Sequence, residues 1–176
     1  LYKSMVYVFL VNMDIDDLQG INFPGPLVNF ETQEYTYLSI GNFIKYKEKF
    51  KDFIVIDEHI ADIIMRCNSH GIKTYYCCAG HSLNLFYVTR RGDSYTPAYD
   101  PYISVERKPI LKQMFMNSKY WFLKEGFVEN GKYPVYRIQF KNVADFNTWT
   151  AAMAELRYMF SFLTNEFRQL PTIKIM

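Results

Sequence analysis

Cysteine and histidine are scarce in this sequence, and their scarcity excludes several kinds of site. Three Cys and three His occur among 176 residues, and an odd number of Cys with no recognisable secretory signal does not make a disulfide framework. A structural zinc site usually takes four ligands in two close pairs. Cys78 and His81 make one candidate pair. Apart from the adjacent Cys77, the other possible ligands among Cys and His are Cys67, His59 and His70. We therefore expect no bound metal, and reduced thiols in a cytoplasmic protein.

Long hydrophobic runs and a strong net charge are also absent. The longest apolar run, Met5–Met13, falls well short of the roughly 20 residues that span a bilayer, so no membrane is expected as a partner. The net charge of +2 gives no global field of the kind that marks many nucleic-acid binders. Any contact with nucleic acid would have to be local. No motif specifies a reaction either.

Aromatic residues are abundant instead. Tyr and Phe number 15 each, and 49% of the residues are hydrophobic, which is enough for a substantial buried core. Interleaved with Lys, Asn and Ile, this composition suggests an AT-rich coding genome, such as that of a low-GC bacterium or its phages. Leu1–Ser4 resemble the end of a fluorescent-protein tag with a serine linker. We therefore expect the native protein to begin at Met5 and to form a single α+β domain over residues 5–176.

Strand patterns dominate the first third of the chain. Met5–Asn12 is apolar and reads as a buried strand, and Asp14–Pro26 has the Gly and Pro content of a loop. Glu34–Ile44 is rich in aromatic and β-branched residues and predicts a second strand. Lys45–Lys51 mixes charge signs and predicts a solvated connection.

Asp57–His70 has the pattern of an amphipathic helix. Asp57 suits the N-cap and Gly71 suits the left-handed position after the helix. Four residues at i, i+3, i+4 and i+7 would bury one face: Ile60, Ile63, Ile64 and Cys67. The strand Ile72–Cys78 follows at once, so a short αβ unit is expected.

The second half alternates strands and helices. Leu83–Thr89 and Tyr102–Lys108 are extended, and Pro109 opens a short helix over Ile110–Asn117. Tyr133–Phe140 alternates two sets of side chains and predicts a half-buried strand, with Val135, Arg137 and Gln139 on one face.

A long C-terminal helix is expected from Asn142, with Asp145 completing a capping box, to Pro171. Apolar residues recur along it in steps of three and four: Phe146, Trp149, Met153, Leu156, Phe160, Leu163, Phe167 and Leu170. We predict that this helix lies across the sheet as the main core element. A coiled-coil seam that makes a homodimer is the alternative. Together these elements predict an α+β fold, a mainly antiparallel sheet with helices on one face, in a ferredoxin-like variant with extra N-terminal strands.

The stretch GIKTYYCCAGHS, residues 71–82, is the best single place to look for a ligand. Successive strand side chains point to opposite faces, so Cys77 and Cys78 diverge and do not share one ion. A turn at Gly80 brings Cys78 and His81 close together and exposes backbone N–H groups that could hold an anion. The alternatives are a purely structural strand end, a small-ligand or nucleotide contact, a thiolate nucleophile activated by His81, and a vicinal disulfide.

Two further features bear on partners. Arg90 and Arg91 lie beside Tyr95 and Tyr99 and could meet phosphates, although a solvated turn is the simpler interpretation. Trp121 suits either the core or a contact with a partner.

The residues from Ile56 to Glu106 resemble a pattern of uncharacterised proteins of low-GC bacteria and their phages. The shared features are an Asp-capped helix, a Gly, a strand and then Cys-x-Gly-His. The layout is also loosely similar to the Ser-x-Ser-Cys-x-Gly-Arg loop of the wybutosine-synthesis tRNA methyltransferase family, whose cofactor is S-adenosylmethionine. Matching positions are Tyr76, Cys78, Gly80 and His81, with Tyr76 and His81 standing where that family has Ser and Arg.

Two functions are compatible with the sequence. The first is a non-enzymatic binding protein, encoded by a phage and present in the host cytoplasm, that engages a nucleotide, a nucleic acid or a host protein machine, for example as a counter-defence inhibitor. Its ligand-binding residues would be Tyr76, Cys78, Gly80, His81, Arg90 and Arg91, and it needs no cofactor. The alternative is a nucleic-acid-modifying enzyme, methyltransferase-like, that uses S-adenosylmethionine.

Overall fold

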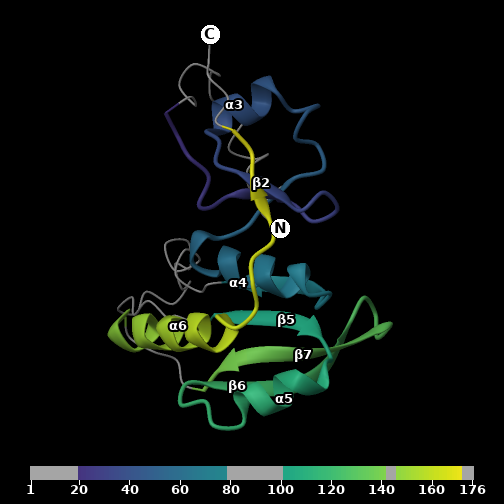
Figure 1. The fold of residues 1–176 in the computed structure, drawn as a ribbon, viewed down its shortest axis with the longest axis vertical. Coiled ribbons are helices and arrows are strands. Elements are labelled where there is room, and N and C mark those ends of the chain that lie inside the picture. The colour runs from purple at the N-terminus through teal and green to yellow at the C-terminus, as the bar shows by residue number, and fades with distance from the viewer. Residues whose placement is uncertain (1–19, 79–100, 142–145, 172–176) are drawn as a thin grey trace, which may run out of the picture. The chain divides into compact units, whose positions relative to one another are not determined.

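The computed structural model describes residues 20–78, 101–141 and 146–171, which contain four helices and eight strands (Figure 1). The strands form two four-stranded sheets, one of them antiparallel throughout, and this confirms the α+β class. The chain divides into unit 1, residues 1–65 with 165–176, and unit 2, residues 66–164. Each unit is described by itself, and the expectation of a single domain over residues 5–176 stays a prediction. Within the described ranges no helix is long and apolar enough to cross a membrane.

The sheet of unit 1 has the order β3-β1-β2-β8. Its strands are short: β1 Leu27–Asn29, β2 Glu34–Thr36, β3 Ile54–Val55 and β8 Arg168–Gln169. β2 pairs in parallel with β8, and the other pairs are antiparallel. A small core lies against this sheet, formed by Phe23, Leu27, Leu38, Phe50 and Phe53. Burial of these side chains is the main favourable term that holds such short strands together.

One expectation for unit 1 is wrong, and a second holds except at one residue. The predicted strand Glu34–Ile44 ends at Thr36, and helix α3, Ile40–Lys45, follows it. Ser39 explains the change, because its Oγ accepts a hydrogen bond from the Asn42 N–H at 3.1 Å and caps the helix. The solvated connection after this helix also carries Phe50, which is 1% exposed and belongs to the core.

Helix α4, Glu58–Ser69, confirms the helix expected at this place. Asp57 caps it through a bond from the His59 N–H to Oδ1 at 3.0 Å, and Gly71 takes the left-handed conformation with φ of 72°. The four residues of the predicted apolar face are all 1% exposed or less: Ile60, Ile63, Ile64 and Cys67.

The burial of Cys67 makes its thiol unreactive. Desolvation raises the pKa of Cys67 to about 12, so the thiolate that reacts with alkylating agents is almost absent at pH 8. We expect iodoacetamide to leave Cys67 unmodified in native protein at pH 8 and to modify it in urea, as measured by peptide mass mapping. Cys77 is half-buried and serves as the internal comparison. Equal labelling of the two thiols in native protein would contradict the buried position of Cys67.

The sheet of unit 2 has the order β4-β5-β7-β6 and is antiparallel throughout. The strands are β4 Thr74–Cys78, β5 Tyr102–Glu106, β6 Trp121–Val128 and β7 Tyr133–Phe140. β5, β7 and β6 lie side by side in Figure 1. β5 and β7 were expected as strands, whereas β6 was not. Its Lys124, Glu125 and Gly126 are poor strand formers, and the eight-residue pairing with β7 overrides their preference.

The helices of unit 2 contact one face of this sheet, which we call the helical face. The indole Nε1–H of Trp121 donates to the carbonyl of Ala152 in α6, Phe146–Phe160, at 2.8 Å. Lys112 of α5, Pro109–Phe115, lies 3.7 Å from Glu125. Antiparallel partners directly opposite each other share a face, so the buried members of the helical face follow from the register: Ile103, Val105, Trp121, Tyr136, Ile138 and Phe140.

The predicted C-terminal helix is too long, because α6 ends at Phe160 and the chain then turns. Arg66 donates to the carbonyls of Ser161 and Leu163, which gives these groups partners outside a helix. The four stripe residues of α6 whose burial is described are at most 4% exposed: Trp149, Met153, Leu156 and Phe160. The chain itself therefore buries this stripe. The capping residues Asn142 and Asp145 lie outside the described residues.

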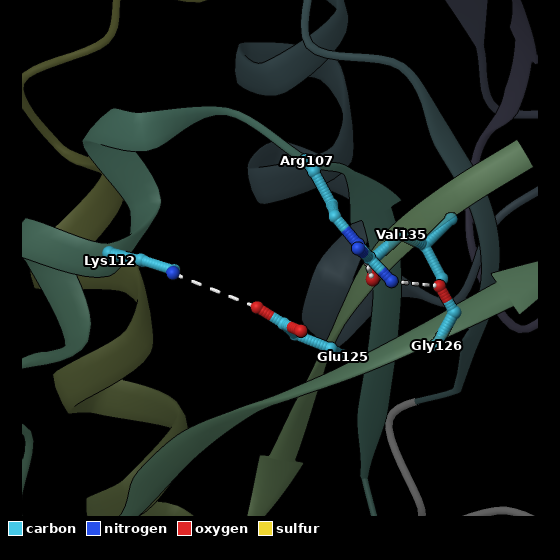
Figure 2. A network of polar contacts seen from close by, with 5 residues as sticks. All are labelled: Arg107, Lys112, Glu125, Gly126 and Val135. Carbon is cyan, nitrogen blue, oxygen red and sulfur yellow. Dashed lines mark hydrogen bonds and ion pairs between the residues drawn. The ribbon is translucent and has the colours of Figure 1, made fainter.

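Arg107 fixes the connection between β5 and α5 (Figure 2). Its Nε donates to the Val135 carbonyl at 2.9 Å and its Nη2 to the Gly126 carbonyl at 2.7 Å. The guanidinium also lies 4.8 Å from the centre of the Phe127 ring. These contacts attach the start of the crossover to both strands of the β6–β7 hairpin. The nearby ion pair of Lys112 and Glu125 is exposed and contributes little.

Candidate nucleic-acid interface

Only two of the six predicted ligand-binding residues lie in the described part of the chain. Tyr76 is on β4, and Cys78 is the last residue of that strand, opposite Tyr102. The successive register partners of Cys77 and Cys78 place these two positions on opposite faces of the sheet. The other four predicted residues lie outside the described ranges: Gly80, His81, Arg90 and Arg91.

The face of the unit 2 sheet away from the helices, which we call the opposite face, carries polar and aromatic side chains. The register assigns its residues on β5, β6 and β7: Tyr102, Ser104, Glu106, Phe122, Lys124, Gly126, Val128, Tyr133, Val135, Arg137 and Gln139. Phe122 of this face is 37% exposed, whereas Ser104 and Val135 are buried. Burial of apolar side chains does not explain why this face carries tyrosines and charged residues.

A bulge in β4 adds two tyrosines to the opposite face. Thr74 pairs with Val105 and Cys77 with Ile103, so two residues of β4 oppose the single residue Ser104. The two are Tyr75 and Tyr76. Tyr75 stacks on Tyr133 of the opposite face, and Tyr76 reaches Glu129 in the β6–β7 turn.

Tyr76 is exposed, and its hydroxyl is bonded. The hydroxyl donates to Oε1 of Glu129, in the β6–β7 turn, at 3.1 Å. This hydrogen bond raises the pKa of Tyr76, because the bond is lost when the phenol ionises. Tyr76 is therefore a neutral donor that ties β4 to the hairpin.

Tyr75 and Tyr133 stack on each other and collect two lysines. Their ring centres are 5.8 Å apart with an angle of 26° between the planes. The Nζ of Lys73 lies 5.0 Å from the Tyr75 ring and 5.5 Å from the Tyr133 ring, and the Nζ of Lys132 lies 5.0 Å from the Tyr133 ring. We call these four residues the tyrosine–lysine cluster. Its ammonium groups are held beside flat π-surfaces.

Arg137 occupies the middle of the opposite face. Its guanidinium carbon lies 4.1 Å from the centre of the Tyr102 ring on the neighbouring strand β5. On its other side Arg137 is directly opposite Lys124 of β6. The Arg137 Nε–H is buried, and no acceptor within residues 20–78, 101–141 and 146–171 bonds to it.

The described residues of the opposite face and its turn have an excess of positive charge. Four cations are present, Lys73, Lys124, Lys132 and Arg137, against the carboxylates Glu106 and Glu129. Both carboxylates are already engaged: Glu106 lies 3.3 Å from Lys108, and Glu129 accepts from Tyr76. The remaining field favours an anion.

The described residues offer no metal chemistry on this face. Among them, no group of three or more His, Cys, Asp and Glu side chains could hold a metal ion. What this face can do is attract phosphate through its cations and stack flat rings on its aromatic side chains.

The sequence reasoning found part of this face and missed the rest. The alternation of β7 placed Arg137 and Gln139 on one face in advance. The tyrosine–lysine cluster was missed, because it joins β4 to β7 across β5 and depends on a bulge that has no sequence signature. The only hint of the cluster in the sequence was the spacing of Lys73 and Tyr75, which are two residues apart in the strand before Cys77 and Cys78.

No protein-family model, curated protein or solved structure matches this chain.

Proposed function

We propose that this chain is a non-enzymatic binding protein that engages nucleic acid through the opposite face of the unit 2 sheet. The observation that supports it is the combination of stacked tyrosines, lysines and an under-bonded arginine on one side of one sheet. Phosphate groups dominate the affinity of most nucleic-acid complexes, and lysine and arginine supply it. Aromatic rings add stacking with bases. In this proposal the opposite face of the sheet and the tyrosine–lysine cluster both contact the nucleic acid.

The arrangement of unit 2 supports a rearranged ferredoxin-like fold. β5, α5 and β6 form a crossover with β7 inserted between the two strands, which is the split βαβ arrangement of that fold. β4 pairs beside β5, at the edge where the last strand of the usual order would lie. The sheet of unit 1 then supplies the extra strands. Some RNA-binding modules use such a four-stranded sheet to stack two or three bases on aromatic side chains.

In this proposal the protein acts in the cytoplasm of a bacterial host, encoded by one of its phages. Binding of nucleic acid would let it compete with a host nucleic-acid machine, as a counter-defence inhibitor does. A host protein is the other partner that the same exposed aromatic residues could contact.

Reversing the charge of the tyrosine–lysine cluster should weaken binding of nucleic acid. We expect Lys73→Glu with Lys132→Glu to lower the affinity for a fluorescein-labelled 20-nucleotide DNA by about tenfold or more. The slope of log K against log salt should fall by the equivalent of about one or two phosphate contacts. Fluorescence anisotropy at several salt concentrations measures both quantities.

The matched control changes the net charge equally in the other unit of the chain. Lys47→Glu with Lys49→Glu alters two exposed lysines of unit 1 and should change the affinity by less than about threefold. Equal losses for the two double variants would contradict the proposed surface. Heat on titration with S-adenosylmethionine, with no binding of oligonucleotide, would instead support the methyltransferase-like alternative.

A further inference from the structure

Arg137 and Lys124 form an arrangement that an anion would complete. Like charges directly opposite in an antiparallel pair are destabilising, and here Arg137 and Lys124 occupy directly opposite positions, with the guanidinium over the Tyr102 ring. The Nε–H of Arg137 is also buried and unbonded among the described residues. A buried donor without a partner costs free energy, and an anion that accepts from it recovers that cost. One oxyanion placed between the two side chains would satisfy both conditions.

The tyrosine–lysine cluster lies on the same face and on the same strand. Tyr133 and Arg137 are four residues apart on β7, which is about 13 Å at the rise of an extended strand. The anion position and the stacked rings are therefore separated by a distance that a short segment of a nucleic-acid strand spans. Lys73 and Lys132 border the ring pair and can meet further phosphates.

A duplex does not fit these features. Its bases are already stacked on one another, and the major groove admits a helix or a two-stranded ribbon, not the broad face of a four-stranded sheet. Tyrosine rings gain stacking energy only from bases that are free to leave their neighbours, as in single strands.

Resting on the proposed function, we infer that the opposite face binds single-stranded nucleic acid, with a phosphodiester group between Arg137 and Lys124 and bases against the rings of Tyr133 and Tyr75. Arg137 supplies the bonded contact through its guanidinium, and Lys124 supplies charge from the neighbouring strand. The tyrosine pair accepts bases of any identity, because every base has a flat face. Binding is accordingly tolerant of sequence and sensitive to salt.

The test compares nucleic-acid strand types with the chain of residues 1–176. Anisotropy is measured with a labelled 12-nucleotide DNA of mixed sequence, the same sequence as RNA, and the blunt duplex of the DNA. We expect at least about tenfold tighter binding of a single strand than of the duplex, and the DNA and RNA arms decide which kind is preferred. Arg137→Gln should weaken single-strand binding about tenfold and lower the salt slope by about one. Arg157→Gln, an exposed arginine on α6, is the matched control.

The tyrosine variants separate stacking from folding. Tyr133→Phe keeps the ring and should bind within about twofold of the parent, whereas Tyr133→Ala should lose about fivefold or more. Circular dichroism checks that both variants are folded. Duplex binding as tight as single-strand binding would overturn this inference and leave the proposed function standing. Failure of the parent protein to bind any of the three oligonucleotides would contradict both the proposed function and this inference. Equal affinities of Arg137→Gln and Arg157→Gln would contradict the phosphate contact at Arg137.

Discussion

Gly25→Ala should destabilise unit 1 by roughly 4 kcal/mol or more, at the upper end of what single substitutions do. A Cβ at this position would lie 1.8 Å from the carbonyl oxygen of Ile56 and 2.5 Å from the Glu58 nitrogen. Both of these are backbone atoms and cannot rotate away. Hydrogen bonds on either side hold the two segments together, since the Ile56 N–H donates to the Pro26 carbonyl and the Glu58 N–H to the Pro24 carbonyl, each at 3.0 Å.

Separation of these segments would disturb both the first strand and the start of α4. Urea unfolding followed by circular dichroism measures the loss, and hydrogen exchange at Leu27–Asn29 shows whether it falls on unit 1. Gly20→Ala is the control, because a Cβ at Gly20 meets nothing within 4 Å. Gly25→Ala with a midpoint equal to that of Gly20→Ala would show that the two backbones do not approach so closely.

Trp121→Ala should cost unit 2 about 3–5 kcal/mol. The side chain is 1% exposed and is the largest fully buried residue in the described part of the chain. It packs edge-on against Phe140, with ring centres 5.6 Å apart, and its indole N–H bonds the Ala152 carbonyl. Truncation would leave a large cavity and remove the partner of a buried carbonyl.

Two further variants make this prediction specific. Trp121→Phe keeps most of the volume and loses the hydrogen bond, so it should cost less than Trp121→Ala. Tyr158→Ala removes an aromatic side chain that is 80% exposed and should change stability by no more than about 0.5 kcal/mol. Urea unfolding monitored by the fluorescence of Trp149, which remains in all three variants, ranks them. A loss of less than about 1 kcal/mol for Trp121→Ala would contradict a core position.

Local signals in the sequence were sufficient where a few neighbouring residues decide the structure. Asp57 and Gly71 bracketed α4 correctly, and the apolar residues between them are buried as expected. Pro109 marks the first turn of α5. Caps and periodicity depend on contacts within one or two helical turns, which is why they can be read from the sequence.

Long-range packing decided the elements that the sequence misjudged. The apolar stripe continues past Phe160, yet α6 ends there, because Arg66 holds the following carbonyls and the chain then pairs with β2 as β8. Glu34–Ile44 is rich in strand-forming residues, yet Ser39 caps a helix over its second half, a local signal that was missed. Propensity is a weak term that tertiary contacts override.

The sequence predicted only part of the candidate site. The expected place, the loop around Gly80 and His81, lies outside the described residues, and of the predicted ligand-binding residues only Tyr76 has a described side chain. Arg137 was placed on the correct strand, but its pairing with Lys124 and Tyr102 needed the register of three strands.

The sequence by itself determined the α+β class, the limits of α4, the start of α5, the strands β5 and β7, and a core rich in aromatic residues. Periodicity, capping and composition are local quantities, and these features depend on nothing else. Only the tertiary structure decided that β4 joins β5 through a bulge, and that Tyr75 meets Tyr133 across a strand. It also decided that Arg137 is the register partner of Lys124, a second cation. Those contacts join residues that are about 13 to 60 positions apart, and which strands become neighbours depends on how the whole chain buries its apolar surface.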